Sequence, residues 1–451
     1  MITSSAFAGK KYAVLGLARS GAAATETLLA SGAQVTAWDR QDVAREAFVG
    51  RCELADPLEI DLTGFDGLVV SPGVPLNTHP IADHAAKFGV PVIGDIELFA
   101  QARGDLPRHK VVGVTGTNGK STTVALIHHI LQSAGIASRL GGNIGVPILG
   151  EEPLPEGGVY VLELSSYQID LTQGLDCDVA VLLNITPDHL DRYDGFEAYA
   201  ASKGRLFAMQ SVNSISIAGH RDTARFELNQ LAEINQFIEN VFHPNTIAAD
   251  EQINWPSLQG PHNAQNAAAA IEVCVSLGLS VERVRDGLET FKGLPHRMER
   301  TATHDGVLYI NDSKATNQAS TAPALSAFPP DPAINGGAKR VHWIVGGLPK
   351  EDGLGECEEH LHNVAAAYTI GEAGPRFAEL LEGRVPVNRA ELLSDAVAQA
   401  KANAGEGEVI LFSPACASFD QFRDFEKRGE HFRQVVAALN SAEISQTGEA
   451  A

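Results

Sequence analysis

The strongest chemical signal in this sequence is a short glycine-containing segment that continues an apolar run. Residues 111–121 read Val-Val-Gly-Val-Thr-Gly-Thr-Asn-Gly-Lys-Ser, and a helical pattern follows over residues 122–134. A strand, a tight loop and a helix N-terminus in this order direct backbone N–H groups toward a phosphate. We therefore expect Lys120 to neutralise phosphate charge and the Ser121 hydroxyl to ligate Mg²⁺. The glycine spacing is shorter than in the standard phosphate-binding loop and predicts a shortened variant, with an ordinary glycine-rich turn as the alternative.

Two later segments carry ligands that suit a divalent metal. Glu163 lies near the end of an apolar run over residues 159–164, and His189 stands between two aspartates in the loop that follows residues 178–185. Carboxylate and imidazole groups without a nearby thiolate suit Mg²⁺ or Mn²⁺ better than zinc. Each residue taken alone is more often a capping or hydrogen-bonded loop residue. Beside a phosphate-binding loop, we predict that both are metal ligands.

A second glycine-containing turn lies near the N-terminus. Residues 16–21 read Gly-Leu-Ala-Arg-Ser-Gly, and Asp39 closes the next apolar run. The pattern is close to the dinucleotide fingerprint, but Ala18 stands where a second glycine would let a pyrophosphate approach. We therefore predict a nucleotide bound in another pose, with Ser20 near phosphate and Asp39 or Arg40 near the base. An ordinary turn between a strand and a helix fits the pattern equally well.

The C-terminal third offers two polar segments, residues 311–316 and 413–425, and each follows an apolar run. Ligands of open α/β sheets bind beyond the carboxyl ends of the strands, where both segments would lie. Lys314 and Lys350 would bind a carboxylate as point charges. Ser418 offers a hydroxyl and Phe425 an apolar wall. These residues predict a site for a small anionic ligand.

The elements that must position these residues alternate along the whole chain. Short apolar runs alternate with helical patterns, which is typical of α/β layers around parallel sheets. A polar segment with proline and glycine over residues 102–110 separates a first series from a second, and residues 293–296 precede a third. We predict strands at residues 12–18, 34–39, 67–73, 91–95, 111–115, 159–164, 178–185, 307–310, 341–345 and 408–412.

Composition agrees with several packed domains. The chain has 451 residues, 44% hydrophobic and 20% charged, with a formal net charge of −22. At roughly 150 residues per domain, this length predicts about three domains. The composition excludes disordered, collagenous and disulfide-scaffold classes. The negative charge repels phosphate backbones and anionic membranes, so we expect no nucleic-acid partner.

Cysteine usage and hydropathy predict the compartment. The five cysteines are scattered and never spaced C-x-x-C, which favours reduced thiols over a disulfide framework or a zinc site. No run approaches the ~18 apolar residues of a membrane span. The first residues have no basic segment before an apolar stretch, so we expect no signal peptide. The sequence therefore predicts a cytoplasmic protein without membrane insertion.

Eight segments together resemble the Mur ligase family, the ATP-dependent amide ligases of peptidoglycan precursor synthesis. They span almost the whole chain in the family's order, at residues 115–121, 141–145, 162–166, 188–193, 262–266, 294–297, 311–316 and 413–418. The last two, with Gly-Asp-Ile-Glu-Leu-Phe at residues 94–99, are most similar to the branch that adds D-glutamate. The resemblance implies three α/β domains: a Rossmann-like domain over residues 1–103, a central P-loop ATPase-like domain with a parallel sheet over 104–293, and a C-terminal Rossmann-like domain over 294–451.

The resemblance also implies a reaction. ATP would convert the L-alanyl carboxylate of UDP-N-acetylmuramoyl-L-alanine into an acyl phosphate. The amine of D-glutamate would then displace phosphate, so that ADP and phosphate are released. ATP, two Mg²⁺ ions (or Mn²⁺) and these two small-molecule substrates are the implied ligands of a monomer that serves cell-wall biogenesis, cell shape and cell division. Lys120 and the metal ions would screen the anions that must meet.

Matching the family's motifs residue by residue implies a role for each position. The implied ATP contacts are Gly116, Thr117, Asn118, Gly119, Lys120, Ser121, Thr122, Asn266, Arg297 and Asp312. The implied contacts to the UDP-substrate are Ser20, Asp39, Arg40, Asn143 and His189. The implied D-glutamate pocket consists of Lys314, Thr316, Lys350, Ser418 and Phe425. The implied catalytic residues are Lys120, His189 and Lys203, and the implied metal ligands are Ser121, Glu163, His189 and Lys203.

Lys203 needs a modification to take that last role. A lysine ammonium beside Mg²⁺ and a triphosphate would repel the metal. The family's matching lysine is carbamylated by CO₂, which turns the cation into an anionic, carboxylate-like ligand. We therefore expect Lys203 to be carbamylated, with a solvent-facing helix lysine as the alternative.

Three other functions compete with this one. A sister ligase that joins another amino acid or another acceptor, such as a folylpolyglutamate synthetase, is the nearest. An NAD-dependent oxidoreductase would use the N-terminal domain, against which Ala18 and the phosphate-binding loop both argue. A nucleotide-binding regulator without activity would leave Lys120, Glu163 and Lys314 without a role.

Overall fold

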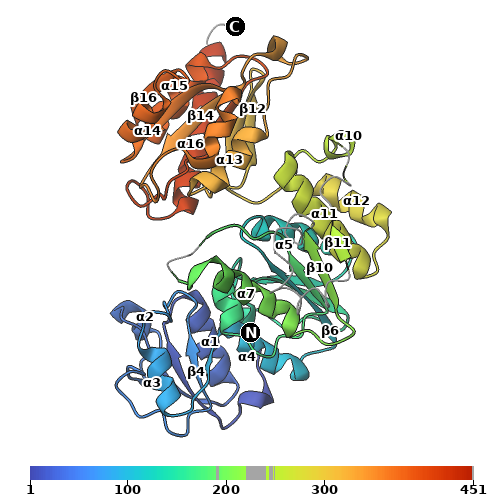
Figure 1. The fold of residues 1–451 in the computed structure, drawn as a ribbon, viewed down its shortest axis with the longest axis vertical. Helices are drawn as coiled ribbons and strands as arrows, with labels where there is room; N and C mark the ends of the chain where they lie inside the picture. Colours follow the sequence, from blue (N-terminus) through green and yellow to red (C-terminus); the bar gives the residue numbers. More distant parts are fainter. Residues whose placement is uncertain (189–191, 220–239, 243–246, 248, 449–451) are drawn as a thin grey trace. The chain divides into compact units, whose positions relative to one another are not determined.

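The structure is a computed structural model of the 451-residue chain, and it describes residues 1–188, 192–219, 240–242, 247 and 249–448. The chain divides into two compact units. The first consists of Met1–Thr246 and Gln265–Glu289, and the second of Ile247–Ala264 and Thr290–Ala451. Figure 1 labels the elements of each unit.

The first sheet is parallel, with strand order β3-β2-β1-β4-β5. Tyr12 and Val14 of β1 face an apolar core that α1 and α4 help to form, whereas Ala13 and Leu15 face a second core that includes α3. Side chains of a strand alternate between the two faces, so helices cover this sheet on both sides. Its elements are β1 (Lys11–Leu15), α1 (Arg19–Ala30), β2 (Gln34–Trp38), α2 (Asp42–Glu46), β3 (Glu53–Leu54), β4 (Gly67–Val70), α3 (Ile81–Lys87), β5 (Val92–Ile93) and α4 (Asp95–Ala102).

The second sheet belongs to the same unit and is also parallel, with order β11-β10-β9-β6-β8-β7. Phe99 of α4 packs edge-on against Tyr160 of β8 with ring centroids 5.0 Å apart, inside one apolar core that joins the two sheets. Its elements are β6 (His109–Thr115), α5 (Lys120–Ser133), β7 (Ser138–Gly142), β8 (Gly158–Glu163), α6 (Ser166–Asp170), β9 (Val179–Leu182), α7 (Gly195–Ala208), β10 (Ile215–Gly219), β11 (Asn240–Phe242), α11 (Pro261–Ser276) and α12 (Val281–Thr290).

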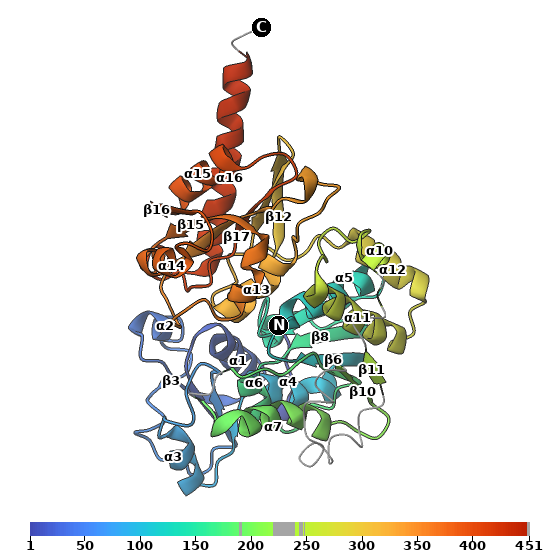
Figure 2. The same ribbon diagram turned by 45° about the horizontal axis from the view of Figure 1, so that its top comes forward.

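The third sheet lies in the second unit, with order β12-β13-β17-β14-β15-β16. All neighbours are parallel except β12, which pairs antiparallel with β13. Helices α13 and α14 line one apolar core and α15 and α16 the other, and in Figure 2 the end of α16 extends beyond the sheet. The elements are α10 (Ala249–Gln252), β12 (Glu299–His304), β13 (Val307–Asn311), α13 (Gln318–Ser326), β14 (Val341–Gly346), β15 (Val364–Ile370), α14 (Gly374–Leu381), β16 (Val387–Glu391), α15 (Leu393–Asn403), β17 (Val409–Phe412) and α16 (Phe425–Gly448).

These sheets confirm the α/β class, but several predicted bounds were wrong. The strand predicted at residues 12–18 ends at Leu15, where Gly16 takes a φ of +90°. Asp95 starts helix α4 rather than ending a strand, and a carboxylate at a helix N-terminus is favoured by the helix dipole. The polar segment at 102–110 is short, since β6 already begins at His109. Strand β12 was not predicted, because its residues are polar on both faces.

Within the part of the chain that the structure describes, every helix is too short or too polar to cross a lipid bilayer.

Candidate active site

The predicted phosphate-binding loop connects β6 to α5, as the sequence indicated. Gly116 and Gly119 take φ angles of +151° and +84°, which side chains with a Cβ rarely adopt. A Cβ on Gly119 would lie 2.2 Å from the Oδ1 atom of Asn266. Asn266 is buried on α11, so the structure brings this predicted ATP contact against the loop.

Asn184, just beyond β9, fixes the backbone of this loop. Its carbonyl accepts the N–H of Thr117 at 2.9 Å and its Oδ1 accepts the N–H of Asn118 at 2.8 Å. Its Nδ2 donates to the Asn118 carbonyl at 3.1 Å. The sequence argument assigned Asn184 no role. An amide side chain at the carboxyl end of a buried strand was the available signal.

Two lysines converge on one carbonyl of the loop. Lys120 Nζ donates to the carbonyls of Gly116 and Thr117, each at 2.8 Å, and Lys203 Nζ donates to the same Gly116 carbonyl at 3.0 Å. Lys203 is 2% exposed on α7. Burial, together with the charge of Lys120, lowers the pKa of Lys203 to about 7. The structure therefore places Lys203 at the phosphate-binding loop and not on a solvent-facing helix surface.

Tyr199 connects α7 to the same loop. Its hydroxyl lies 3.1 Å from the Oγ1 atom of Thr117, which accepts the N–H of Thr186 at 3.0 Å and donates to the Thr186 carbonyl at 3.1 Å. The ring lies 4.6 Å from Lys203 Nζ. Burial raises the pKa of Tyr199 to about 12, so the hydroxyl keeps its proton. The sequence argument missed this residue, although it stands one helical turn before Lys203.

Among the predicted metal ligands that the structure describes, Glu163 has surroundings that favour a cation. It ends β8 opposite Val114 of β6 and is 3% exposed. Its Oε1 accepts from Asn143 Nδ2 at 3.1 Å, while its buried Oε2 has no hydrogen-bond partner among the residues that the structure describes. A buried carboxylate oxygen without a donor is unfavourable unless a cation or water completes it. Nearby Ser121 is buried at the start of α5.

Glu163 has few further protein ligands for a metal in the described part of the chain. Over the described residues, no three side chains of histidine, cysteine, aspartate or glutamate gather in one place that would hold a metal. His189, the other predicted ligand of this type, lies outside the described residues. The groups near Glu163 therefore fit Mg²⁺ only with help from substrate oxygens or a modified lysine.

Three residues predicted to bind the UDP-substrate lie beyond strands of the first sheet. Asp39, after β2, accepts the N–H of Leu17 at 2.6 Å and of Gln41 at 2.9 Å. It thereby fixes the turn that leads to Ser20 at the start of α1. Arg40 is exposed. Ser20 and Asp39 follow neighbouring parallel strands, and Arg40 follows Asp39, so all three residues lie at the carboxyl edge of the sheet.

Asn143 belongs to the second sheet instead. It follows β7, and its backbone N–H donates to the Glu163 carbonyl at 2.9 Å. Arg19 of α1 donates to the carbonyl of Gly145, so the turn after Asn143 and the start of α1 are in contact. The predicted UDP-substrate residues that the structure describes therefore come from both sheets of one unit.

In the second unit, a strained loop collects three predicted residues. His296 and Met298 take φ angles of +61° and +47° on either side of Arg297. Such left-handed positions cost about 1–3 kcal/mol each and persist only where neighbours hold them. The N–H of Lys314 donates to the His296 carbonyl at 3.0 Å, and the N–H of Met298 donates to Asp312 Oδ1 at 3.1 Å. Arg297, Asp312 and Lys314 thus share one framework.

Asp312 has a second partner and a perturbed acidity. Its Oδ2 accepts from the Ser413 hydroxyl at 2.7 Å. Burial raises the pKa of Asp312 to about 7, against the opposing effects of the Ser413 and Met298 hydrogen bonds. Both carboxylate oxygens are thus engaged within the unit.

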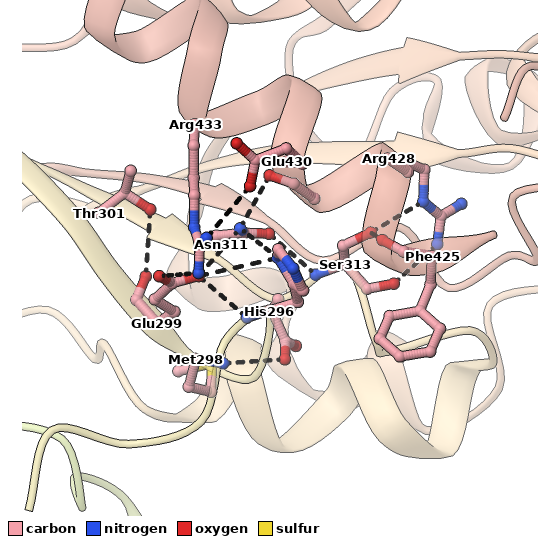
Figure 3. Close-up of polar contacts among 12 residues, drawn as sticks. His296, Met298, Glu299, Thr301, Asn311, Ser313, Phe425, Arg428, Glu430 and Arg433 are labelled. Atoms are coloured by element: carbon pink, nitrogen blue, oxygen red, sulfur yellow. Dashed lines mark hydrogen bonds and ion pairs between the residues drawn. The ribbon is translucent and has the colours of Figure 1, made fainter. Parts of the chain in front are cut away.

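Glu299 is the central acceptor of the framework (Figure 3). Its carboxylate accepts from the His296 N–H at 2.9 Å, from Asn311 Nδ2 at 3.1 Å and from Arg433 Nη2 at 2.5 Å. Asn311 Nδ2 also lies 2.9 Å from His296 Nδ1, whose pKa burial lowers. Glu299 thereby connects the strained loop to β13 and α16. Glu299 and Arg433 were not predicted from the sequence, because they are far apart along the chain and meet only in the folded unit.

The predicted D-glutamate residues lie on neighbouring loops of this unit. Lys314 Nζ lies 4.1 Å from the centre of the Phe425 ring. Lys350 is exposed, and its Nζ donates to Thr316 Oγ1 at 3.2 Å. Ser418, in the segment between β17 and α16, is buried.

A short antiparallel bridge aligns two of these loops. The N–H groups of Leu348 and Ala417 donate to each other's carbonyls, both at 2.9 Å. Because Lys350 and Ser418 follow these two residues closely, the bridge brings their loops together.

Comparison with known proteins identifies the class. Residues 114–274 match the model of the Mur ligase middle domain, and residues 296–416 match the Mur ligase glutamate ligase domain. The chain belongs to the Mur ligase family.

Curated relatives that match almost the whole chain share one name. The chain is 64% identical over 439 residues to a UDP-N-acetylmuramoylalanine–D-glutamate ligase of Novosphingobium aromaticivorans, covering 97% of each chain. It is 57% identical to the protein of the same name from Sphingopyxis alaskensis, covering 98% of this chain and all of the relative. The fold is similar to that of a MurF ligase of Thermotoga maritima in complex with ADP, with a TM-score of 0.61, 18% identity and 96% of each chain covered.

Proposed function

We propose that this protein is an ATP-dependent ligase that joins D-glutamate to UDP-N-acetylmuramoyl-L-alanine and releases ADP and phosphate. The full-length similarity to ligases of that name is the observation that carries the proposal. The phosphate-binding loop with its two lysines supplies the chemical support. We also propose domain boundaries near residues 103 and 293, a monomer, and action in the cytoplasm, where its five free thiols would stay reduced.

The first step is phosphoryl transfer to a carboxylate, so two anions must approach each other. The ammonium of Lys120 would leave the Gly116 and Thr117 carbonyls for the phosphate oxygens, because a charged partner binds it more strongly. Asn184 fixes the loop backbone, and Tyr199 contacts the Thr117 side chain, so the N–H groups of the loop need little rearrangement. Asn266, Arg297 and Asp312 are the further proposed ATP contacts, with Thr122 on α5.

Mg²⁺ would supply Lewis-acid stabilisation of the transferring phosphoryl group. Its proposed holders are Ser121, the unpartnered Oε2 of Glu163, His189 and a carbamate on Lys203. The Lys203 ammonium first loses a proton, and the neutral amine then attacks CO₂ to form an N–COO⁻ group and releases a second proton to solvent. This turns the second cation at Gly116 into an anion and removes its repulsion with Lys120.

The UDP-substrate is assigned to Ser20, Asp39, Arg40, Asn143 and His189, and D-glutamate to Lys314, Thr316, Lys350, Ser418 and Phe425. The cationic Lys314 beside the Phe425 ring suits a carboxylate on an aliphatic stem. The amine of D-glutamate would attack the acyl phosphate, and phosphate would leave from the tetrahedral intermediate.

Phosphate release with each amino acid and acceptor in turn tests the proposal. We expect rapid release only with ATP, D-glutamate and UDP-N-acetylmuramoyl-L-alanine together. Rapid release with another amino acid or acceptor would identify a sister ligase. NADH binding without ligation would favour the oxidoreductase, and nucleotide binding without turnover would favour a regulator.

A further inference from the structure

Arg428 is a buried cation to which neither the sequence argument nor the proposed mechanism gives a role. It lies on α16, is 1% exposed and donates four hydrogen bonds. Nε donates to Ser313 Oγ at 3.1 Å, Nη2 to the carbonyls of Ser313 at 2.8 Å and Cys416 at 3.0 Å, and Nη1 to the carbonyl of Ala417 at 3.0 Å. Figure 3 shows Arg428 beside Ser313, with Phe425 on the same helix.

These partners precede the residues assigned to D-glutamate. Ser313 comes directly before Lys314, and Ala417 directly before Ser418. The Ser313 hydroxyl also donates to the carbonyl of Phe425 at 2.9 Å. One guanidinium therefore holds the two loops and the start of α16 in a single arrangement.

The third loop, which carries Lys350, reaches the same group. A Cβ on Gly347 would lie 3.0 Å from Arg428 Nη1 and 2.4 Å from the Ala417 carbonyl. Gly347 takes a φ of +137°, so this close approach depends on glycine. Leu348 then pairs with Ala417. All three loops assigned to the amino acid thus meet around Arg428.

The charge of Arg428 is not balanced locally. Its partners are carbonyls and a hydroxyl, and among the described residues it forms no ion pair with a carboxylate. Asp420 acts on it only through space. Burial lowers its pKa to about 10, so it stays charged at neutral pH. A buried charge without a counter-ion is costly and is retained where an anion completes the balance.

We propose that Arg428 is a positioning residue of the amino-acid site, which aligns the loops of Lys314, Lys350 and Ser418 and adds a positive charge that favours an acidic amino acid. This proposal rests on the proposed function, since it concerns the binding of D-glutamate. It explains why a guanidinium with a planar fork is needed, because an ammonium cannot reach all these acceptors at once.

Two substitutions separate the alignment from the charge. Arg428→Lys keeps the charge and loses the fork, whereas Arg428→Met loses both. We expect the KM for D-glutamate to rise about threefold to tenfold in the first and at least about tenfold in the second, the scale seen when a buried hydrogen-bonded charge is removed. The KM for the UDP-substrate should stay within about twofold. Arg423→Met is the matched control, since its side chain is 87% exposed in the same segment, and it should leave all constants unchanged.

Thermal melting of each variant identifies those that remain folded. An unchanged D-glutamate KM in folded Arg428→Lys and Arg428→Met would overturn the proposal, as would a parallel rise in the KM of all three substrates. If neither variant folds, Ser313→Ala, which removes one acceptor of Arg428, is tested instead. Its KM for D-glutamate should rise while the KM values for the other substrates stay the same, and an unchanged D-glutamate KM would overturn the proposal. A wild-type protein that does not use D-glutamate at all would instead overturn the proposed function.

Discussion

The predicted phosphate-binding loop and the loops proposed for the amino acid both lie against buried or half-buried cations, but these cations are bound in different ways. At the first loop, the ammonium groups of Lys120 and Lys203 both donate to the carbonyl of Gly116 and repel each other, and Lys120 also donates to the carbonyl of Thr117. In the C-terminal unit, Arg428 donates to four acceptors, and Arg433 is paired with Glu299 and Glu430.

The number and kind of acceptors around each cation therefore distinguish two kinds of cation, the lysines at the first loop and the arginines of the C-terminal unit. Two cations that donate to the same neutral carbonyl repel each other, so they gain most from an anionic ligand or a chemical modification. A cation with a full set of neutral acceptors, such as Arg428, fixes the backbone around it, and its charge still favours an anionic ligand nearby. Removing the first kind should therefore affect turnover, and removing the second kind should affect substrate affinity or stability.

The largest effect is expected at Lys120. Lys120→Ala removes the charge proposed to stabilise the transferring phosphoryl group, so kcat should fall by ~10³-fold, the upper end for one positioned donor. Steady-state phosphate release measures this. Lys110→Ala, at an exposed position of β6, is the control and should be nearly unchanged. Near-normal turnover in Lys120→Ala would place the phosphate site elsewhere.

Lys203→Ala tests the second cation of the loop. If Lys203 acts as a carbamate, the variant should lose ~10²-fold in kcat, as for one electrostatic group, while it still binds the UDP-substrate. Formate should restore part of the activity by supplying a carboxylate. Arg205→Ala on the same helix, a half-exposed partner of Asp170, should need no such rescue. Full activity with an unmodified amine in crystal density would contradict the carbamate.

Lys314→Ala extends the comparison to a cation of the C-terminal unit that is assigned to the ligand. Loss of the charge next to Phe425 should raise the KM for D-glutamate by about tenfold, as for a lost charge-assisted contact. The KM for the UDP-substrate should change much less. Lys339→Ala, an exposed lysine of the same unit, is the control. Equal changes in both constants would argue against separate sites.

The smallest effect on activity is expected from Glu299→Gln. This change weakens the pair with Arg433 and the acceptor for the strained loop, so the free energy of unfolding should fall by about 1–2 kcal/mol. Denaturant unfolding measures the change. Glu358→Gln breaks an exposed pair with Arg384 in the same unit and should cost less than about 0.5 kcal/mol. Equal losses would mean that Glu299 is no more than a surface partner.

The sequence by itself determined the features that depend on neighbours along the chain. Alternation of apolar runs and helices gave the α/β class, since strand and helix periods are local. The order β6, loop, α5 around Lys120 was predictable for the same reason, because the glycines and the lysine stand within one short segment. Family motifs added Asn266, which the structure places against Gly119.

Only the tertiary structure decided which distant residues meet. Asn184 and Arg428 bind backbone groups far away in sequence, and Tyr199 contacts the distant Thr117 hydroxyl. No local pattern specifies such pairs. Asp95 and β12 were predicted wrongly for another reason. Local sequence preference placed Asp95 in a strand and gave no strand at β12, whereas packing in the fold selected a helix and a strand. Burial, which lowers the pKa of Lys203 and raises that of Asp312, likewise depends on everything that surrounds a side chain. The sequence therefore specifies which residues are candidate ligand-binding groups. Their charge state and alignment depend on burial and on tertiary contacts, which form only in the folded protein.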